Sequence, residues 1–219
     1  MGDKVYKVLE FIMIVFFGFS FFSISSETIK GNNTICIDPG HGGKDGGCER
    51  DGIYEKDINL SIAYYLRDEL ESLGYIVEMT RLGDYDLASE NAKVRKLEDL
   101  NRRCEIINRN SMFISIHVNK FSMQSVSGAQ VFCTENIKNV NLAKCIQGNL
   151  NYVTEIKKDY KVCHDKYLLN NAKSIGCLVE VGFISNDKDF NKLKKDEYQM
   201  RIAKVISISV LEYFEKISS

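Results

Sequence analysis

The sequence predicts an α/β fold in which a single domain contains a mainly parallel central sheet of about six strands, flanked by helices on both faces. Short apolar runs with the composition of buried strands alternate with longer segments whose apolar residues recur every three or four positions. Strands that alternate with helices of this length are typical of a parallel sheet covered on both sides. The 219 residues contain no internal repeat and no low-complexity tract, which favours one domain behind a targeting segment.

The first half of the domain is expected to begin with a buried strand over residues 34–37. This strand stops at Asp38-Pro39-Gly40, where proline fixes one backbone angle and glycine permits the next. The elements expected after this turn are a glycine-rich loop over 42–52, a helix with apolar positions Ile58, Ile62, Leu66, Leu70 and Leu73 that Gly74 ends, a strand over 75–80, a polar loop over 81–91, a helix with Leu97, Leu100, Cys104 and Ile107 on one face, and a strand over 112–118.

The second half of the domain is expected to contain two further strands and two helices. The expected elements are a loop over 122–127, a strand over 128–133, a helix over 140–152, a strand over 177–181 that Gly182 closes, and a helix over about 196–217. Residues 159–171 are ambiguous and are consistent with a strand and a turn. The lysine-rich runs at 157–158 and 192–195 are expected to be solvated surface.

Residues 1–26 have the pattern of a signal peptide or an N-terminal membrane anchor. Lysines precede an apolar run over residues 11–24, which is shorter than the ~20 residues that a spanning helix needs. The residues that follow match a cleavage site poorly, so both cleavage and retention stay open. Residues 27–33 then form a linker, and residues 34–219 form the folded domain. We therefore expect an extracytoplasmic protein that is secreted or associated with the membrane through its N-terminal segment.

The composition argues against several classes of function. The chain has 29 basic and 30 acidic residues and a net charge of −1, so nothing indicates a nucleic-acid partner. The seven cysteines are an odd number, no two have C-x-x-C spacing, and most lie in apolar runs, where a free thiol behaves as a small hydrophobe. The sequence therefore predicts neither a disulfide framework nor a thiolate metal site.

Three of the apolar strands each carry one polar group that does not belong in a core. His41 follows the first strand, His117 lies near the end of the third, and Glu180 lies within the fifth. Burying a carboxylate without a partner costs several kcal/mol, so residues placed in this way have a hydrogen-bonding or charged partner or a functional role. Because the carboxyl ends of parallel strands meet at one edge of a sheet, we expect the three side chains to converge.

Such a convergence would have the composition of a catalytic zinc site. Two imidazoles and a carboxylate bind catalytic zinc and leave a fourth position for water. The reaction also needs a free base. Glu55, which opens the helix after the glycine-rich loop, is the better candidate for the third ligand, and Glu180 is then the base. His164, in the ambiguous segment, is expected to be solvent-exposed, to touch substrate, or to complete the zinc shell.

Four motifs in the domain resemble those of the zinc-dependent N-acetylmuramoyl-L-alanine amidases, the amidase type 3 family. They are, in the family's order, Asp38-Pro-Gly-His-Gly-Gly43, Glu55-Lys-Asp-Ile-Asn59, Ser115-Ile-His-Val-Asn119 and Glu180-Val-Gly-Phe-Ile-Ser-Asn186. Two shorter patterns also fit: Thr80-Arg81, and Leu100-x-x-Arg103-x-x-x-Ile107-Asn108, in which isoleucine stands where the family usually has alanine. The resemblance extends from residue 34 to the C-terminus.

The resemblance implies that His41, Glu55 and His117 bind one Zn²⁺ per chain and that Glu180 is the catalytic glutamate. The implied reaction is hydrolysis of the amide bond between the lactyl group of N-acetylmuramic acid and L-alanine. Its substrate would be peptidoglycan glycan strands with their stem peptides. Candidate substrate contacts are Asn119, Arg81 and His164.

The short domain behind an N-terminal signal, without wall-binding repeats, resembles the sporulation members of this family. These enzymes remove stem peptides so that the spore cortex acquires muramic lactam, which would place the protein in the space between the forespore membranes. Whether an accessory protein switches the enzyme on stays open. Two other interpretations compete. One is another zinc peptidase, such as a carboxypeptidase in which Arg81 or Arg103 clamps a free carboxylate, and the other is a non-catalytic wall-binding protein.

Overall fold

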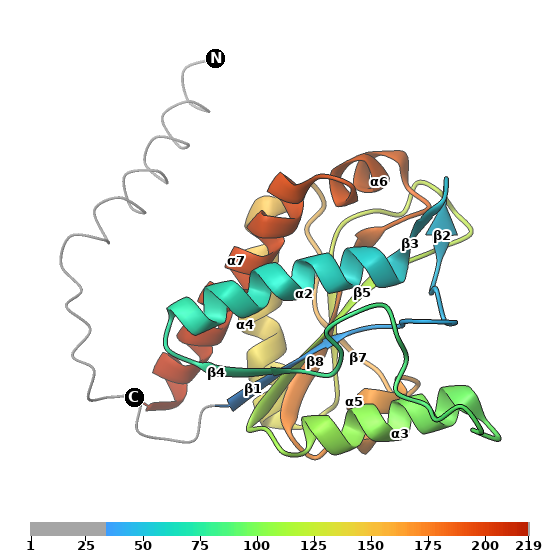
Figure 1. The fold of residues 1–219 in the computed structure, drawn as a ribbon. Coiled ribbons are helices and arrows are strands. Elements are labelled where there is room, and N and C mark those ends of the chain that lie inside the picture. Colours follow the sequence, from blue (N-terminus) through green and yellow to red (C-terminus); the bar gives the residue numbers. More distant parts are fainter. Residues whose placement is uncertain (1–33, 219) are drawn as a thin grey trace. The chain divides into compact units, whose positions relative to one another are not determined.

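The computed structural model describes residues 34–218 (Figure 1). The predicted signal peptide or anchor over 1–26 and the linker over 27–33 lie outside the described residues. Within the described part of the chain, every helix is too short or too polar to cross a lipid bilayer.

The described elements follow the predicted alternation of strands and helices. In chain order they are β1 (Thr34–Pro39), β2 (Glu49–Arg50), β3 (Ile53–Tyr54), α2 (Glu55–Ser72), β4 (Ile76–Met79), α3 (Arg95–Ile107), β5 (Met112–Asn119), β6 (Gln130–Cys133), α4 (Ile137–Val153), β7 (Lys161–Val162), α5 (Tyr167–Asn171), β8 (Ile175–Phe183), α6 (Asp187–Leu193) and α7 (Asp196–Ser218).

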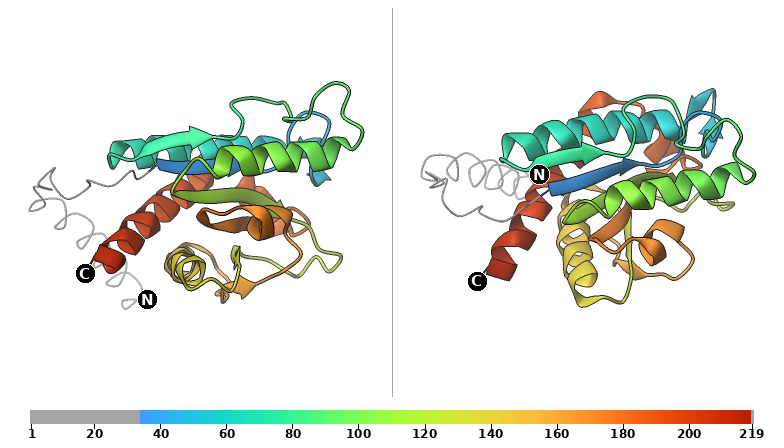
Figure 2. Two further views of the ribbon diagram at one scale, coloured as in Figure 1. Left: turned by 90° about the horizontal axis from the view of Figure 1, so that it is seen from below. Right: turned by 60° about the horizontal axis from the view of Figure 1, so that its bottom comes forward.

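Six strands form the central sheet in the order β4-β1-β5-β8-β6-β7, which can be followed in Figure 2. The pairs β1–β4, β1–β5, β5–β8 and β6–β7 are parallel, whereas β6 is antiparallel to β8. The predicted α/β class and the mainly parallel sheet are thus confirmed. A loop without a crossover helix leads from β5 to β6, so β6 starts at the edge of the sheet where β5 ends and runs opposite to β5 and to its parallel neighbour β8.

Helices cover both faces of the sheet, and alternate strand residues face opposite layers. On β1, Ile35 and Ile37 belong to the larger apolar cluster beneath α2, α4 and α7. Cys36, between them, belongs to the smaller cluster beneath α3 and α5. This alternation follows from the two-residue repeat of a strand. The apolar run of β1 is therefore buried on both sides, beneath the helices that cover the two faces of the sheet (Figures 1 and 2).

Three details differ from the sequence-based expectation. The glycine-rich loop contains a short antiparallel hairpin, β2–β3. Residues 159–171 contain the two-residue strand β7 and the five-residue helix α5. The short helix α6 was not expected, and its Phe190 and Leu193 are buried, whereas Lys194 and Lys195 of the lysine run are exposed as expected. This helix was missed because it has only 7 residues, although Asn186 caps it by accepting hydrogen bonds from the backbone N–H groups of its first turn.

Candidate metal centre

His41 is held just beyond β1 in a backbone conformation that non-glycine residues rarely adopt. Its φ is +63°, in the left-handed region. Two buried arginines hold the turn in place. Arg103 donates to the carbonyl of His41 at 2.6 Å and to that of Pro39 at 2.9 Å. Arg81 donates to the carbonyls of Pro39 at 2.9 Å and Gly40 at 3.1 Å. These hydrogen bonds fix the backbone from which the imidazole projects.

Glu55 is the first residue of α2, where a carboxylate is favoured by the positive end of the helix dipole. Its side chain is buried, and both oxygens accept backbone hydrogen bonds. Oε2 accepts from the N–H of Cys48 at 2.9 Å, and Oε1 accepts from the N–H of Val118 at 3.0 Å. The glycine-rich loop and β5 therefore clamp this carboxylate in one orientation.

His117 lies near the carboxyl end of β5 and faces Glu55. Its Nδ1 is 3.0 Å from Glu55 Oε1. The space that its ring occupies exists because residue 40 is glycine. A Cβ at Gly40 would lie 2.2 Å from His117 Cε1 and 2.4 Å from Nε2, well inside contact distance. The Pro-Gly pair before His41 thus serves the second histidine as well as the turn.

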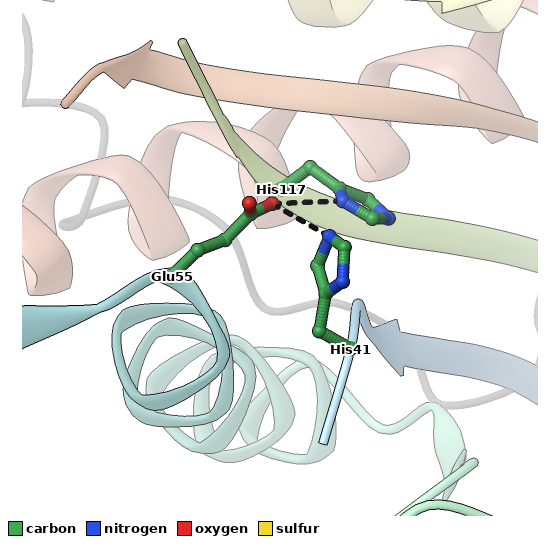
Figure 3. Close-up of side chains that lie close together, drawn as sticks. All are labelled: His41, Glu55 and His117. Carbon is green, nitrogen blue, oxygen red and sulfur yellow. Dashed lines mark hydrogen bonds and ion pairs between the residues drawn. The ribbon is translucent and has the colours of Figure 1, made fainter. Parts of the chain in front are cut away.

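The three predicted ligand residues meet in one cluster, shown in Figure 3. One candidate ligand atom from each of His41, Glu55 and His117 lies within 4.8 Å of the others. His41 Nε2 is 3.2 Å from Glu55 Oε1, and the two imidazole rings meet edge to face with centroids 5.1 Å apart. Two ring nitrogens thus converge on one carboxylate oxygen. Nitrogen and carboxylate donors in this number fit a divalent metal ion with an open position.

The electrostatics of the cluster couple protons to metal binding. Burial on its own would raise the pKa of Glu55, but the hydrogen bonds and charges of His117 and His41 outweigh it and hold that pKa well below its usual range. Burial would lower the pKa of His41, whereas Asp45 and Glu55 raise it to about 9. A histidine must be neutral to bind a metal, so a metal ion and a proton compete for His41.

Glu180 lies beside this cluster but is not one of its three members. It is the register partner of His117 across the β5–β8 pair and is 5% exposed. Burial raises its pKa, although the neighbouring His117 opposes that effect. Lys166 Nζ is 3.8 Å from Oε1, while Oε2 has no hydrogen-bond partner among residues 34–218. Glu180 is therefore a buried carboxyl group with one oxygen still able to accept a proton or a hydrogen bond.

Two acids that support the histidines were not assigned from the sequence. Asp45 Oδ1 is 2.9 Å from His41 Nδ1, on the side of the ring away from Glu55, and Asp45 also forms an ion pair with Lys96. Asp38 is fully buried and pairs with Arg103 at 2.7 Å. Asp38 opens the motif around His41 and Asp45 follows that motif by two residues, but a sequence does not show which side chain a turn residue meets.

The three candidate substrate contacts have different surroundings. Asn119 is half-buried at the end of β5, two residues beyond His117. Arg81 is 1% exposed, and its guanidinium donates to four backbone carbonyls. His164 is largely exposed, lies 3.5 Å from Glu135, and is outside the metal cluster. Their contact with substrate stays a prediction. Because Arg81 and Arg103 are both buried and bonded to protein oxygens, neither presents a clamp for the carboxypeptidase alternative.

Comparisons with known proteins identify the family of the chain. The Amidase_3 family model, described as N-acetylmuramoyl-L-alanine amidase, matches residues 35–212. The germination-specific N-acetylmuramoyl-L-alanine amidase of Bacillus subtilis is 41% identical over 187 residues, which cover 82% of this chain and 79% of that protein. LytC of the same organism, also an N-acetylmuramoyl-L-alanine amidase, is 29% identical over 83% of this chain and 35% of its own length.

A solved structure shows the same fold with related sequence. The CwlD amidase of Clostridioides difficile, determined in complex with the GerS lipoprotein, matches with a TM-score of 0.79 and 38% identity, over 84% of this chain and 98% of that chain. The family match covers most of the chain and includes the His41, Glu55 and His117 cluster. The chain therefore belongs to the Amidase_3 family and is an N-acetylmuramoyl-L-alanine amidase, a hydrolase that acts on peptidoglycan.

Proposed function

We propose that this amidase cleaves the bond between the lactyl group of muramic acid and L-alanine with one Zn²⁺ held by His41, Glu55 and His117, and with Glu180 as general base. The observation that carries the proposal is the position of Glu180, a buried carboxyl group in register with His117. The alternative in which Glu180 is a ligand and Glu55 the base is less favourable, because Glu55 forms the cluster with both histidines.

The donor set favours zinc over the harder divalent ions. Two imidazoles and one carboxylate with an open fourth position are typical of catalytic zinc, whereas Mg²⁺ and Ca²⁺ prefer all-oxygen sites. When bound, zinc lowers the pKa of a water ligand towards ~7 and polarises the substrate carbonyl. Asp45 Oδ1 lies 2.9 Å from His41 Nδ1, so Nε2 is the ring nitrogen on the side of Glu55 and would be the one to bind the metal.

Glu180 is suited to moving the proton that amide hydrolysis requires. Burial favours its neutral form, and a neighbouring cation favours its ionised form. A carboxyl group balanced between these effects can accept a proton from water at Oε2 and then donate it to the departing amine of L-alanine. Lys166, 3.8 Å from Oε1, adds a positive charge that favours the ionised form before the reaction.

We further propose that the enzyme acts outside the cytoplasmic membrane on spore-cortex peptidoglycan, where it removes stem peptides before muramic lactam forms. Residues 1–26 would act as signal peptide or anchor, 27–33 as linker and 34–219 as catalytic domain. The B. subtilis relative is germination-specific by name, and the C. difficile relative was solved with a lipoprotein, which supports an accessory protein for this chain too. The enzyme would then act in the space between the two membranes of the forespore.

The test is mass spectrometry of muropeptides after incubation of purified cortex peptidoglycan with the full-length protein. The expected products are stem peptides with a free L-alanine amine and glycan strands whose lactyl groups now end in free carboxylates. Chelation should abolish the release, and added Zn²⁺ should restore it. Peptides cleaved within the stem would overturn the proposed reaction. Peptide release that chelator does not affect would overturn its metal dependence.

A further inference from the structure

A groove of about 510 Å³ lies next to Glu180 and has no part in the metal cluster. Its lining includes three aromatic rings, two lysines and the candidate substrate contact at the end of β5: Phe121, Phe132, Phe183, Lys158, Lys161 and Asn119. We call it the lysine groove. Phe121 is 51% exposed at this surface, so the groove opens to solvent through an apolar edge.

The lysine groove is continuous with the catalytic edge of the sheet. Gln130, which also lines it, is the register partner of Glu180 in the β6–β8 pair. Paired residues of neighbouring strands project from the same face, so the two side chains lie next to each other. Lys166 links the same two regions, because its Nζ is 3.8 Å from Glu180 Oε1 and 5.5 Å from the centroid of the Phe132 ring. A ligand in the groove therefore reaches the reacting centre.

Fixed positive charge sets the chemistry of the groove. Lys158 is half-buried, donates to the carbonyl of Gly128 at 3.0 Å and lies 4.3 Å from the centroid of the Phe183 ring. Lys161 is exposed and is the register partner of Phe132. Among the described residues that line the groove, Asp159 is the one acid, so the lysines outnumber it. Such a surface attracts an anionic ligand that also has apolar parts.

We propose that the lysine groove binds the stem peptide through its free carboxylates, with Lys161 as the principal contact and Lys158 behind it. This inference rests on the proposed function, in which the scissile amide joins a glycan to a peptide. The two halves of the substrate must extend from the metal in different directions. Unmodified glycan offers hydroxyl and acetamide groups, whereas the peptide carries carboxylates, which complement lysine.

The test uses two soluble muropeptides that differ only in whether the stem carboxylates are free or amidated. We expect the full-length enzyme to show a KM about fivefold lower for the free acid, since exposed charge pairs contribute modestly. Lys161→Met should remove this preference by raising KM for the free acid, with kcat nearly unchanged. Lys157→Met, an exposed lysine outside the lining, is the matched control and should keep the preference. High salt should reduce the preference in the wild type.

A binding measurement separates this inference from the proposed function. Titration calorimetry of both muropeptides with zinc-loaded full-length Glu180→Gln should give the same fivefold preference, lost again in Glu180→Gln/Lys161→Met. Equal binding of the free and amidated forms would overturn the assignment of the groove, whatever the activity of the wild type. If the free-acid muropeptide still binds more tightly but the wild type does not cleave the amide, the result would contradict the proposed function and support the assignment of the lysine groove.

Discussion

Replacing Asp38 with asparagine would remove the charge that anchors the turn before His41. Asp38 is fully buried, and its carboxylate accepts hydrogen bonds from Thr80 Oγ1 at 2.7 Å, Ser115 Oγ at 2.6 Å and Arg103 Nη1 at 2.7 Å. Burial alone would raise the pKa of Asp38, but the charge of Arg103 and the two hydroxyl groups outweigh it and lower that pKa from 3.8 to about 2.

The expected loss of stability follows from this pKa. The lowering corresponds to about 2 kcal/mol of folding free energy at neutral pH. Removing one partner of a buried ion pair costs about 3–5 kcal/mol, but asparagine keeps one acceptor and Asp99 still pairs with Arg103 at 2.9 Å. We therefore expect Asp38→Asn to lower the free energy of unfolding by about 2–4 kcal/mol. For a domain of this size, the melting temperature would fall by roughly 5–15 °C.

Urea unfolding of the full-length protein between pH 7 and pH 2.5 measures this effect. The pKa is lowered in the folded state, so its stabilisation is complete above the unfolded value near 4 and is lost as the pH falls through the folded value near 2. The difference between wild type and Asp38→Asn should therefore shrink below pH 4. Asp68→Asn, an exposed control, should change stability by less than about 0.5 kcal/mol. A difference at pH 7 as small as that of the control would refute the reasoning.

Three further predictions concern metal binding. Purified protein should hold about one zinc per chain, and His117→Ala should lose most of it; unchanged zinc content in this variant and in His41→Ala would contradict the site. Gly40→Ala should weaken zinc binding at least ~10-fold by displacing the His117 ring, whereas Gly148→Ala, whose Cβ would meet open space in α4, should leave it unchanged. Asp45→Asn should weaken zinc binding ~10-fold by releasing His41. Competition with a chromophoric chelator measures the zinc affinity, and an affinity equal to that of the wild type would contradict this role of Asp45.

The convergence of the candidate ligands could be predicted because the carboxyl ends of parallel strands meet at one edge of a sheet. β1, β5 and β8 are neighbours, so His41 and His117 necessarily end up at one edge with Glu180. Glu55 could be placed near His41 because it opens the helix that follows the loop from His41. In each case the residue's place in an element determines its place in space, and the periodicity of the sequence reveals the element.

The supporting residues could not be predicted because their partners come from distant segments. Asp38 meets Arg103, 65 positions away, and nothing in the local pattern of either residue indicates that contact. Asp45 reaches His41 only through the path of a loop that contains several left-handed glycines. The lysine groove combines parts of β5, β6, β8 and the segment around Lys158, which showed no clear periodicity in sequence.

Zinc content and muropeptide release, measured side by side on Glu180→Gln and Glu55→Gln, test the central assignment most directly. Glutamine keeps the size of glutamate but cannot accept the proton, so Glu180→Gln should retain zinc and fold while losing activity by at least ~100-fold. Glu55→Gln should lose zinc first, because its carboxylate belongs to the cluster with both histidines. An active Glu180→Gln enzyme, or a Glu180→Gln variant that sheds zinc while Glu55→Gln retains it, would contradict this account.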